Sequence, residues 1–508
     1  MSEPVRLRVA SLDEDLDASL AEIERSLGGP DCRVRAGRER LHRAMEGGGA
    51  IYGVNTGFGA LKSVRVPDGD LARLQLNLLR SHAVGMGEPI AREISRLMLR
   101  LKAHALGLGW SGVSVAVVER LLWMIRHDVI PVVPSQGSLG ASGDLAPLAH
   151  LALPLVGEGR VWRDGEEVPA SDVLREHGLA PVALGAKDGL ALINGTQFMA
   201  AHLAEVVRRG RTLATTADVV AAITLEAIRG SARPFEAHVQ AVRPHPGALA
   251  SAANVRALLE GSEILPSHAD CAKVQDPYSV RCVPPVHGAS RDALAFAEQA
   301  LEVEINSVTD NPLVLLREGE PDVVSAGAFH GQPLAIAADV VSIALAEWAS
   351  VSERRTYLLV DGHDDLPPFL VREGGLNSGF MMPQYLAAAL VSENKTLAHP
   401  ASVDSIPSSR NQEDHVSMGA WGARKALRIV ENAERVLAVE ALCAAQALEH
   451  RRPLRAGRGV EAAVHSIRQR VAVREADGPF EADLGAALDL VRSGALVRAA
   501  EKVTGTLA

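Results

Sequence analysis

The sequence predicts a mostly α-helical protein. Alanine and leucine, which head the scale of helix propensity, are abundant, whereas aromatic residues make up only 3% of the chain. The segment Ala423–Glu449 contains neither glycine nor proline, and its apolar residues recur on one broad helical stripe. Strand-like alternation is confined to short pieces, such as VRLRVA at residues 5–10 and GRVWRDGEEV at residues 159–168.

The same helical periodicity returns along the chain and predicts further helices. In order, these segments are Val115–Arg126, Gln197–Arg209 and Ala289–Ile305. An apolar window at Pro333–Val351 is interrupted by Asp339 and Glu347, so we expect a buried core helix there rather than a membrane span.

Composition restricts the class of protein. A chain of 508 residues with 47% hydrophobic residues is expected to fold into two or three soluble domains. The net charge of −10 and the scattered cations argue against a nucleic-acid partner. The N-terminus lacks the apolar core of a signal peptide, which favours the cytoplasm. A reducing compartment also suits the cysteines, which form no CxxC pair and no regular framework: Cys32, Cys271, Cys282 and Cys443.

The stretch GSLGASGDLAP, Gly137–Pro147, places three glycines and several small residues before an apolar segment. As a turn it makes sense, because Asp144 or Ser142 could cap a helix that begins near Leu145, with Pro147 in its first turn. The glycines follow GxxGxxG rather than GxGxxG, and no lysine-serine pair follows, which excludes a phosphate loop. A GxSxG nucleophile elbow is excluded because position 144 is aspartate instead of glycine.

The same residues could also change the backbone chemically. The amide nitrogen of Gly143 could attack the carbonyl of Ala141, because glycine lacks a Cβ and permits close, strained backbone approach. Loss of the Ser142 hydroxyl as water would then leave an exocyclic methylene on a five-membered ring. Such a ring is an electrophile, which the ordinary side chains, all nucleophiles or acids and bases, do not supply. Ala-Ser-Gly by itself is a common tripeptide, so the surrounding loops must decide.

Those loops carry six further motifs in order along nearly the whole chain. They are YGVNTGFG at Tyr52–Gly59, NGTQ at Asn194–Gln197, QDPYSVRC at Gln275–Cys282, TDNPL at Thr309–Leu313, AFHGQP at Ala328–Pro333 and NQEDHVSM at Asn411–Met418. Together with GSLGASGDLAPLAH they resemble the aromatic amino acid ammonia-lyases. SHAVG and HPASVDSIPSSRNQEDHVSMG are similar to the branch of that family that acts on histidine.

The resemblance implies a fold and a reaction. It implies an N-terminal helical domain with a little β-structure (residues 1–193) and then an elongated helical bundle of the fumarase/aspartase type (residues 194–508). The implied reaction removes ammonia from L-histidine to give trans-urocanate, the first step of histidine degradation toward glutamate. The implied prosthetic group is 4-methylidene-imidazol-5-one (MIO), which forms autocatalytically from Ala141, Ser142 and Gly143, so neither an external cofactor nor a metal is needed. The implied assembly is a homotetramer that binds neither nucleic acid nor membrane.

The reacting groups are assigned by the same resemblance. Tyr52 is implied as the base that takes the β-proton, with Glu413 as the alternative. The ordinary tyrosine pKa of about 10 would have to be lowered by positive potential, part of it from Arg281. Arg281 is implied to hold the substrate carboxylate through its planar guanidinium. Tyr278 is implied to help form the ring or to orient the amine.

Three more residues are implied to line the pocket, namely Asn194, Gln275 and Phe329. Asn194 would hydrogen-bond the ring carbonyl or the substrate carboxylate, and Phe329 would lie beside the prosthetic ring. Without the resemblance, each residue has an ordinary structural explanation. Tyr52 and Phe329 would be packing residues, Arg281 would form a surface ion pair and Asn194 would cap a helix.

His82 and Glu413 are implied to select the substrate, although a lone histidine is usually structural and a glutamate is usually solvated. Phenylalanine-specific members of the plant kind have a Phe-Leu pair near position 82 and a glutamine near position 413. Tyrosine-specific members keep the histidine but follow it with leucine, whereas Ala83 follows here. An imidazole with one donor and one acceptor nitrogen fits His82 plus a carboxylate.

Two departures from the family pattern concern the neighbours of these residues. Ser408–Arg410 reads Ser-Ser-Arg where Thr-Ser-Ala is common, and Ala328 stands where asparagine is common before Phe329. Arg410 brings a charge near Glu413, which affects the expected rate and affinity more than the expected reaction type.

Two other functions compete with the lyase: an aminomutase and a catalytically inactive scaffold. An aminomutase with the same ring would return ammonia to the β-carbon, and product analysis would separate the two. A catalytically inactive helical scaffold would require Ser142, Tyr52 or Arg281 to be missing, and all three are present. The run Asp361–Asp365 lacks HExxH and EF-hand spacing, so we interpret it as a solvated loop rather than a metal site.

Overall fold

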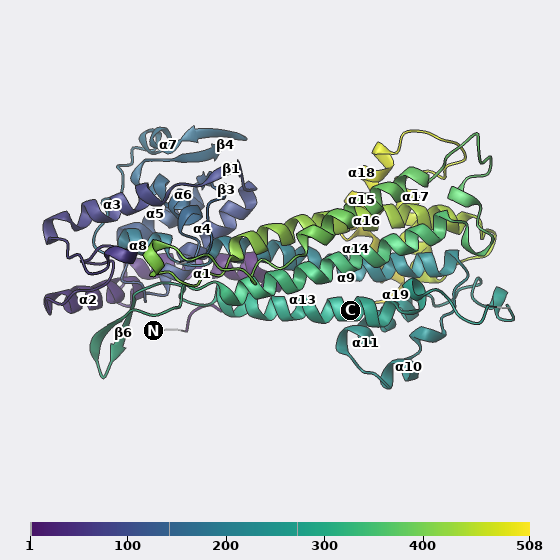
Figure 1. Cartoon of the computed structure of the whole chain (residues 1–508), viewed down its shortest axis with the longest axis horizontal. Helices are drawn as coiled ribbons and strands as arrows, with labels where there is room; N and C mark the ends of the chain where they lie inside the picture. Colours follow the sequence, from purple (N-terminus) through teal and green to yellow (C-terminus); the bar gives the residue numbers. More distant parts are fainter. Residues whose placement is uncertain (1–2, 142, 272) are drawn as a thin grey trace. The chain divides into compact units, whose positions relative to one another are not determined.

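The protein is mostly helical, as the sequence predicts, in its computed structural model (Figure 1), which describes residues 3–141, 143–271 and 273–508. It folds into two compact units, each built from three segments of the chain. The first unit contains residues 1–205, 298–338 and 400–424, and the second contains residues 206–297, 339–399 and 425–508. This division differs from the single boundary expected after residue 193, because two later segments return to the first unit.

Short and medium-length helices make up most of the first unit. Its α-helices are α1 (Leu12–Leu27), α2 (Arg33–Glu46), α3 (Leu71–His82), α4 (Arg92–Gly107), α5 (Val115–Arg126), α6 (Leu145–Ala152), α7 (Ala170–Glu176) and α8 (Asp188–Ile193). Its 3-10 helices are η1 (Val9–Ser11), η2 (Gly59–Leu61), η3 (Asp68–Asp70), η4 (Leu153–Val156) and η9 (Ser409–Asn411). The prediction for α5 is confirmed at both ends.

Three small antiparallel sheets also belong to the first unit. β1 (Met86–Pro89) pairs with β3 (Pro134–Gln136), with Met86 opposite Gln136. β4 (Arg160–Arg163) lies between β2 (Ile130–Pro131) and β5 (Glu166–Pro169), which confirms strand structure in GRVWRDGEEV. A hairpin that the sequence did not predict joins β6 (Leu313–Arg317) to β7 (Glu320–Val324).

The strand expected for VRLRVA is wrong. Residues 5–8 are irregular and η1 follows them. The backbone N–H groups of Leu7 and Val9 donate to the side chains of Asn306 (2.7 Å) and Glu302 (3.1 Å). Side chains thus satisfy donors that a neighbouring strand would otherwise pair.

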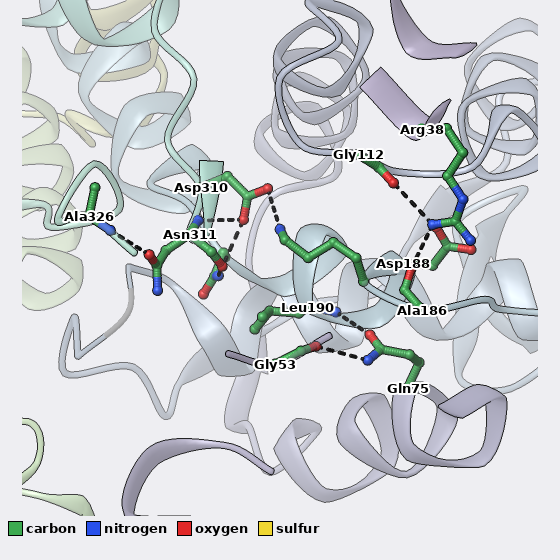
Figure 2. Close-up of polar contacts among 12 residues, drawn as sticks. Arg38, Gly53, Gln75, Gly112, Ala186, Asp188, Leu190, Asp310, Asn311 and Ala326 are labelled. Carbon is green, nitrogen blue, oxygen red and sulfur yellow. Dashed lines mark hydrogen bonds and ion pairs between the residues drawn. The ribbon is translucent and has the colours of Figure 1, made fainter. Parts of the chain in front are cut away.

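A buried apolar cluster in the first unit fixes the YGVNTGFG loop. Val54 of that loop is completely buried with Leu41 of α2, Leu71 of α3 and Val314 of β6. In addition, the side chain of Gln75 in α3 donates to the carbonyl of Gly53 at 3.1 Å (Figure 2). The loop that carries Tyr52 is therefore held by packing and by hydrogen bonding.

Helices dominate the second unit as well. Those within it are α10 (Ala237–Ala241), α11 (Pro246–Leu258), α12 (Tyr278–Arg281), α15 (Met381–Leu397), α17 (Arg458–Arg468), α18 (Glu481–Arg492) and α19 (Ala495–Thr504), with the 3-10 helices η5 (Arg233–Phe235), η6 (Pro266–His268), η7 (His363–Asp365) and η8 (Pro368–Leu370). Four long helices have bounds that include residues of both units: α9 (Gln197–Ala227), α13 (Val283–Ile305), α14 (Gln332–Val360) and α16 (Gly419–Glu449).

Buried polar contacts join the long helices within the second unit. Arg355 of α14 forms a bidentate ion pair with Glu440 of α16, at 2.6 and 2.8 Å. Asp218 of α9 accepts from the imidazole of His287 in α13 at 2.7 Å. Charges buried in pairs of this kind satisfy each other where water is excluded. The second unit is therefore a helical bundle with a polar interior layer.

The long helices confirm the sequence predictions and extend them. α16 contains Ala423–Glu449, while α9 continues well beyond Arg209 and α13 begins before Ala289. In the described part of the chain, α14 is the one helix long and apolar enough to cross a membrane, but most of its apolar stretch is buried inside the protein. Its Asp339 forms an ion pair with Lys425 at 2.7 Å, which is typical of a core helix.

Candidate active site

The loop Gly137–Gly143 has a backbone that only glycine tolerates at several positions. Gly140 and Gly143 have φ angles of +79° and +74°. A Cβ on Gly143 would lie 2.1 Å from the carbonyl oxygen of Gly195, and a Cβ on Gly140 would lie 2.2 Å from Oγ of Ser417. Ser142 lies outside the described residues. The glycines therefore bring the Ala141–Gly143 segment against the NGTQ loop and the NQEDHVSM loop.

Asp144 follows this loop and links it to a second helix. Its N–H donates to the carbonyl of Gly195 at 2.7 Å, and α6 begins at the next residue. Its carboxylate accepts from the N–H of Met199 at 3.1 Å, so Asp144 caps α9 rather than α6. Complete burial raises the pKa of Asp144 to about 7.

A pocket of about 160 Å³ opens between this loop and the SHAVG segment. His82, Ala141 and Gly143 all line it. Nδ1 of His82 lies 2.9 Å from the carbonyl oxygen of Leu78, which can only accept, so Nδ1 carries the proton. Burial lowers the pKa of His82, an effect that Leu78 and Glu413 partly offset. The imidazole is thus neutral at pH 7 and has Nε2 available as an acceptor.

Tyr52 lies partly buried near Glu413. Its hydroxyl oxygen accepts from the N–H of Gly59 at 3.2 Å. Burial raises the pKa of Tyr52 and the negative charge of Glu413 adds to the rise, while the Gly59 hydrogen bond lowers it in part. The lowered pKa that a basic role requires is therefore not found within this unit, because burial outweighs the one hydrogen bond to the phenolic oxygen.

Glu413 is held by hydroxyl groups of its own loop. Its Oε2 accepts from the Ser408 hydroxyl at 2.6 Å, and the two residues also pair through their backbones. Oγ of Ser409 accepts from the N–H of Ala60 at 3.0 Å, which ties this loop to the one that carries Tyr52. Arg410, the charged departure from the family pattern, is exposed and has a left-handed φ of +54°.

Phe329 is partly buried in the turn before α14. The next residue, His330, stacks on His415 of the NQEDHVSM loop with ring centroids 5.8 Å apart. A Cβ on Gly331 would lie 2.3 Å from the Met199 side chain, so this turn also approaches α9 closely. The loops that carry Phe329 and Glu413 therefore lie together.

Asn194 is buried at the end of α8, with 1% of its surface exposed. Its side-chain amide nitrogen donates to the carbonyl of Asn311 at 2.7 Å and to the carboxylate of Asp310 at 3.3 Å. Because both partners are acceptors, the orientation of the amide is fixed. Its Oδ1 has no hydrogen-bond partner among the described residues. The oxygen, rather than the nitrogen, is therefore available to a ligand, which does not fit the predicted hydrogen bond to a ring carbonyl or a substrate carboxylate, because both of those are acceptors.

Sequence reasoning missed the buried charges that support Asn194. Lys187 pairs with Asp310 at 2.7 Å, and the Asp310 carboxylate also accepts from the backbone N–H of Asn311 (Figure 2). Lys102 donates to the backbone carbonyl of Asn194, and burial lowers the pKa of Lys102 to about 7. The available signal was a lysine between Leu101 and Ala103 in the second half of α4, which is mostly buried.

The remaining predicted residues belong to the second unit. Gln275 and Tyr278 are exposed, and Tyr278 opens the short helix α12. Nε of Arg281 donates to the carbonyl of Asp276 at 3.0 Å, and its guanidinium lies 4.5 Å from the centre of the Tyr278 ring. The loop thus presents an aromatic hydroxyl and a guanidinium side by side.

Six predicted positions belong to the first unit, namely Tyr52, His82, the described part of the Ala141–Gly143 segment, Asn194, Phe329 and Glu413, and of these His82, Ala141 and Gly143 line the pocket. Gln275, Tyr278 and Arg281 form a second group in the other unit. No cluster of three metal-ligating side chains occurs among the residues that the structure describes. Asp364, within the acidic run interpreted as a solvated loop, is instead buried in ion pairs with Arg229 and Lys273.

Comparisons with known proteins agree on one family. The model of the aromatic amino acid lyase family matches residues 30–469. A histidine ammonia-lyase from Deinococcus radiodurans is 56% identical over 475 residues, covering 92% of this chain and 90% of that protein. One from Sorangium cellulosum is 49% identical and covers 96% of this chain and 98% of that protein.

Solved structures with similar folds include two different activities. Histidine ammonia-lyase from Trypanosoma cruzi superposes with a TM-score of 0.85 at 42% identity, covering 93% of this chain and 89% of that one. Tyrosine aminomutase from Streptomyces globisporus has a TM-score of 0.89 at 37% identity and covers 100% of both chains.

Proposed function

Because this chain belongs to the aromatic amino acid lyase family, we propose that it removes ammonia from L-histidine and releases trans-urocanate. It is a carbon–nitrogen lyase. The observation that carries the choice of histidine is the pocket in which neutral His82, held by Leu78, lies beside the Ala141–Gly143 segment and within the electrostatic reach of Glu413. Relatives near 50% identity over almost their full length support the same activity.

The pocket suits an imidazole because it offers two polar partners. Nε2 of neutral His82 and the carboxylate of Glu413, which Ser408 holds in place, are both acceptors for a ring N–H. A neutral imidazole can donate to one of them at a time, and a buried polar group left without a partner costs about 1–3 kcal/mol. A phenyl ring offers no such partner. These residues therefore bind and orient the imidazole rather than react.

The difficult step is the loss of a weakly acidic β-proton and of a poor leaving group. Tyr52 is the base that receives the proton. Its raised pKa in the first unit means that the complete site must supply positive potential to the phenolic oxygen. Arg281 binds the substrate carboxylate through its two parallel N–H donors, and Gln275 and Tyr278 stand on the same loop to orient the amine.

The backbone around residues 141–143 fits a cyclised Ala-Ser-Gly. Gly143 lies where any Cβ would collide with Gly195, and the N–H of Asp144 donates to the carbonyl of the same residue, so Gly143 is held closely against the NGTQ loop. A residue without a Cβ is what the proposed ring closure needs at this position. MIO would supply the electrophile that makes the amino group a better leaving group.

The enzyme is a homotetramer in the cytoplasm. In the second unit, a groove of about 490 Å³ between α14 and α15 has exposed apolar side chains on its walls and nearby, such as Ile343 (54% exposed) and Tyr385 (55% exposed). Exposed apolar patches of this kind favour burial against another copy. All four cysteines are free thiols, which suits a reducing compartment.

A second candidate is an aminomutase, which the similarity to tyrosine aminomutase over the whole chain favours. One experiment separates the two. Purified protein incubated with L-histidine should develop the ultraviolet absorbance of urocanate and release one ammonia per urocanate. A β-amino acid without net ammonia release would identify an aminomutase, and no consumption of L-histidine would contradict both.

A further inference from the structure

The loop that carries Gln275, Tyr278 and Arg281 has few regular hydrogen bonds of its own. Residues 273–277 are irregular, and α12 contains only four residues. Gln275 and Tyr278 are exposed, so neither side chain fastens the loop. The residues on either side of Gln275 must therefore hold it in place.

One of these neighbours, Lys273, is bound on three sides by the second unit. Its Nζ lies 2.7 Å from Oδ1 of Asp364 and donates to the carbonyls of Ile228 (2.9 Å) and Arg229 (3.3 Å). The ammonium group thus has one partner for each of its three hydrogens. On the other side of Gln275, the Asp276 carboxylate accepts from the N–H of Ser231 at 2.6 Å.

Asp364 is the centre of this anchor. Its Oδ2 lies 2.5 Å from Nε of Arg229, and its backbone carbonyl accepts from Arg451 at 2.7 Å. Only 8% of its side chain is exposed. Burial raises the pKa of Asp364, but the hydrogen bonds from Arg229 and Lys273 more than offset this, so the pKa is lowered and the carboxylate stays ionised.

The backbone of the anchor lies in conformations that side chains rarely adopt. Asp364 and its neighbour Asp365 have φ angles of +58° and +62°, and Arg229 has a φ of +51°. Such a residue persists only where its surroundings over-determine its conformation. Here the surroundings are the ion pairs of Asp364 with Arg229 and Lys273. Because Lys273 belongs to the loop that carries Gln275, these residues with left-handed backbone contact that loop.

We propose that Asp364 is a positioning residue that, through Lys273, fixes the loop presenting Gln275 and Arg281 to the substrate. The proposal rests on the proposed function for the role of Arg281, but the anchor itself does not. The carbonyl of Asp276 accepts from Nε of Arg281, so an anchored loop also orients the guanidinium. Losing the anchor should therefore weaken the grip on a carboxylate more than the recognition of an imidazole.

The test uses Asp364→Asn and Lys273→Met, which break the same contact from its two ends. Asp365→Asn is the matched control, because Asp365 pairs with Arg229 but is 91% exposed and does not contact Lys273. Lys273→Arg keeps a cation at the same position and should restore most of the effect of Lys273→Met. Using both ends guards against a variant that merely folds poorly.

Hydrogen exchange of the ligand-free tetramer gives a readout that does not depend on activity. A peptide spanning residues 269–281 should exchange faster in Asp364→Asn and Lys273→Met, and at the original rate in Asp365→Asn. Unchanged exchange in both anchor variants would overturn the anchor, whatever reaction the enzyme catalyses. If the unmutated protein makes no urocanate while exchange rises as expected, the proposed function fails and the anchor stands.

Kinetics then separates positioning from simple destabilisation. Mutations within a coupled network change binding by about 2- to 30-fold, and we expect an increase of that size in KM for L-histidine. Inhibition by urocanate, which has a carboxylate, should weaken in parallel, whereas inhibition by histidinol, which has none, should hardly change. A lower Tm with unchanged KM, or equal weakening for both inhibitors, would show that Asp364 has only a structural role.

Discussion

Tyr52 and His82 are both biased toward their neutral forms within the first unit. Burial raises the pKa of one and lowers the pKa of the other. For His82 this suits the assigned role, because a neutral imidazole whose Nδ1–H is bound to Leu78 offers a fixed acceptor. For Tyr52 it means that activity should rise with pH as the phenol ionises, with the midpoint set by the positive potential of the complete site.

Replacing Tyr52 with phenylalanine tests that base. Only the phenolic oxygen is lost, so KM for L-histidine should change little, while kcat should fall by about two to four orders of magnitude. Steady-state kinetics with urocanate absorbance measures both. Tyr385→Phe, an exposed tyrosine on α15, is the control and should leave kcat unchanged. Near-normal turnover in Tyr52→Phe would transfer the role of base to Glu413 or another group.

Arg281→Lys tests the grip on the substrate carboxylate. Lysine keeps the charge but loses the planar fork, so affinity for L-histidine should fall by about tenfold or more, the effect of roughly one charged hydrogen bond. Histidinol has no carboxylate and should inhibit both forms almost equally. Equal weakening for the two ligands would contradict the assigned role.

Single residues also show where sequence reasoning succeeds and where it stops. The motifs predicted which residues would gather in the first unit, because loop residues in ordered motifs mark function. They did not predict that Asp144 caps α9, since a cap is assigned by sequence to the helix that follows it. Nor did they predict the contacts of Lys102 or Asp310, because buried ion pairs join residues far apart in the chain.

Among the elements, the helices were predicted well and the short strands poorly. Helical periodicity repeats over many residues, so α5 and α16 could be identified from local sequence alone. VRLRVA has strand-like alternation, yet its backbone donors bind Asn306 and Glu302 from a distant helix. The alternation of a short segment does not reveal which partner will satisfy its backbone.

Loop backbones carry most of the strain at the site. Ser409, Arg410 and Asn411 have consecutive left-handed φ angles of +49°, +54° and +64°, just before Glu413. Strain of this kind persists at sites whose surroundings impose it. Here two hydrogen bonds hold the segment: the Ser408 hydroxyl donates to Glu413, and the N–H of Ala60 donates to the Ser409 hydroxyl.

The loop at Ala141–Gly143 is predicted to differ in covalent structure from its sequence. If Ala-Ser-Gly cyclises, ring closure removes the Ala141 carbonyl oxygen as one water and the Ser142 hydroxyl leaves as a second, so the intact protein should weigh two water molecules less than its sequence. Ser142→Ala should fold normally, because only a small hydroxyl is lost, and should lose most of its activity. Intact-mass spectrometry with circular dichroism checks both statements. A full, unmodified mass in active protein would rule out the cyclised loop.

For the whole molecule, stability should depend on a buried carboxyl in the second unit. Glu226 accepts from the N–H of Gly457 at 2.8 Å and is completely buried. Burial raises its pKa to about 7 from an ordinary value near 4.5. A raised carboxyl pKa favours folding at low pH, and this stability is lost as pH rises from about 4.5 through 7.

Glu226→Gln should remove this loss because glutamine stays neutral. The free energy of unfolding of the variant should increase relative to that of the unmutated enzyme as pH rises from 5 to 8, by on the order of a few kcal/mol. The measurement is Tm, which should fall less in the variant. Glu481→Gln, at an exposed position in α18, should follow the unmutated enzyme. A constant difference in Tm across this pH range would show that Glu226 does not titrate there.

The division of the molecule into two discontinuous units could not be predicted from the sequence. Residues 298–338 and 400–424 join the first unit, so Phe329 and Glu413 belong to the same unit as the Ala141–Gly143 segment. Only long-range packing establishes such a return. The membership of the site stays a prediction from the family resemblance.

Substrate choice is measured by kcat/KM of the unmutated enzyme for L-histidine, L-phenylalanine and L-tyrosine. In the proposed site, neutral His82 and the Ser408-bound Glu413 accept from the substrate ring, and a phenyl ring has no donor for either group. Sites built on such hydrogen bonds reject ligands lacking the partner by about four orders of magnitude or more. We therefore expect a ratio for L-histidine over L-phenylalanine far above a hundredfold. A ratio near one, or a preference for L-tyrosine, would contradict the assignment of L-histidine as the substrate.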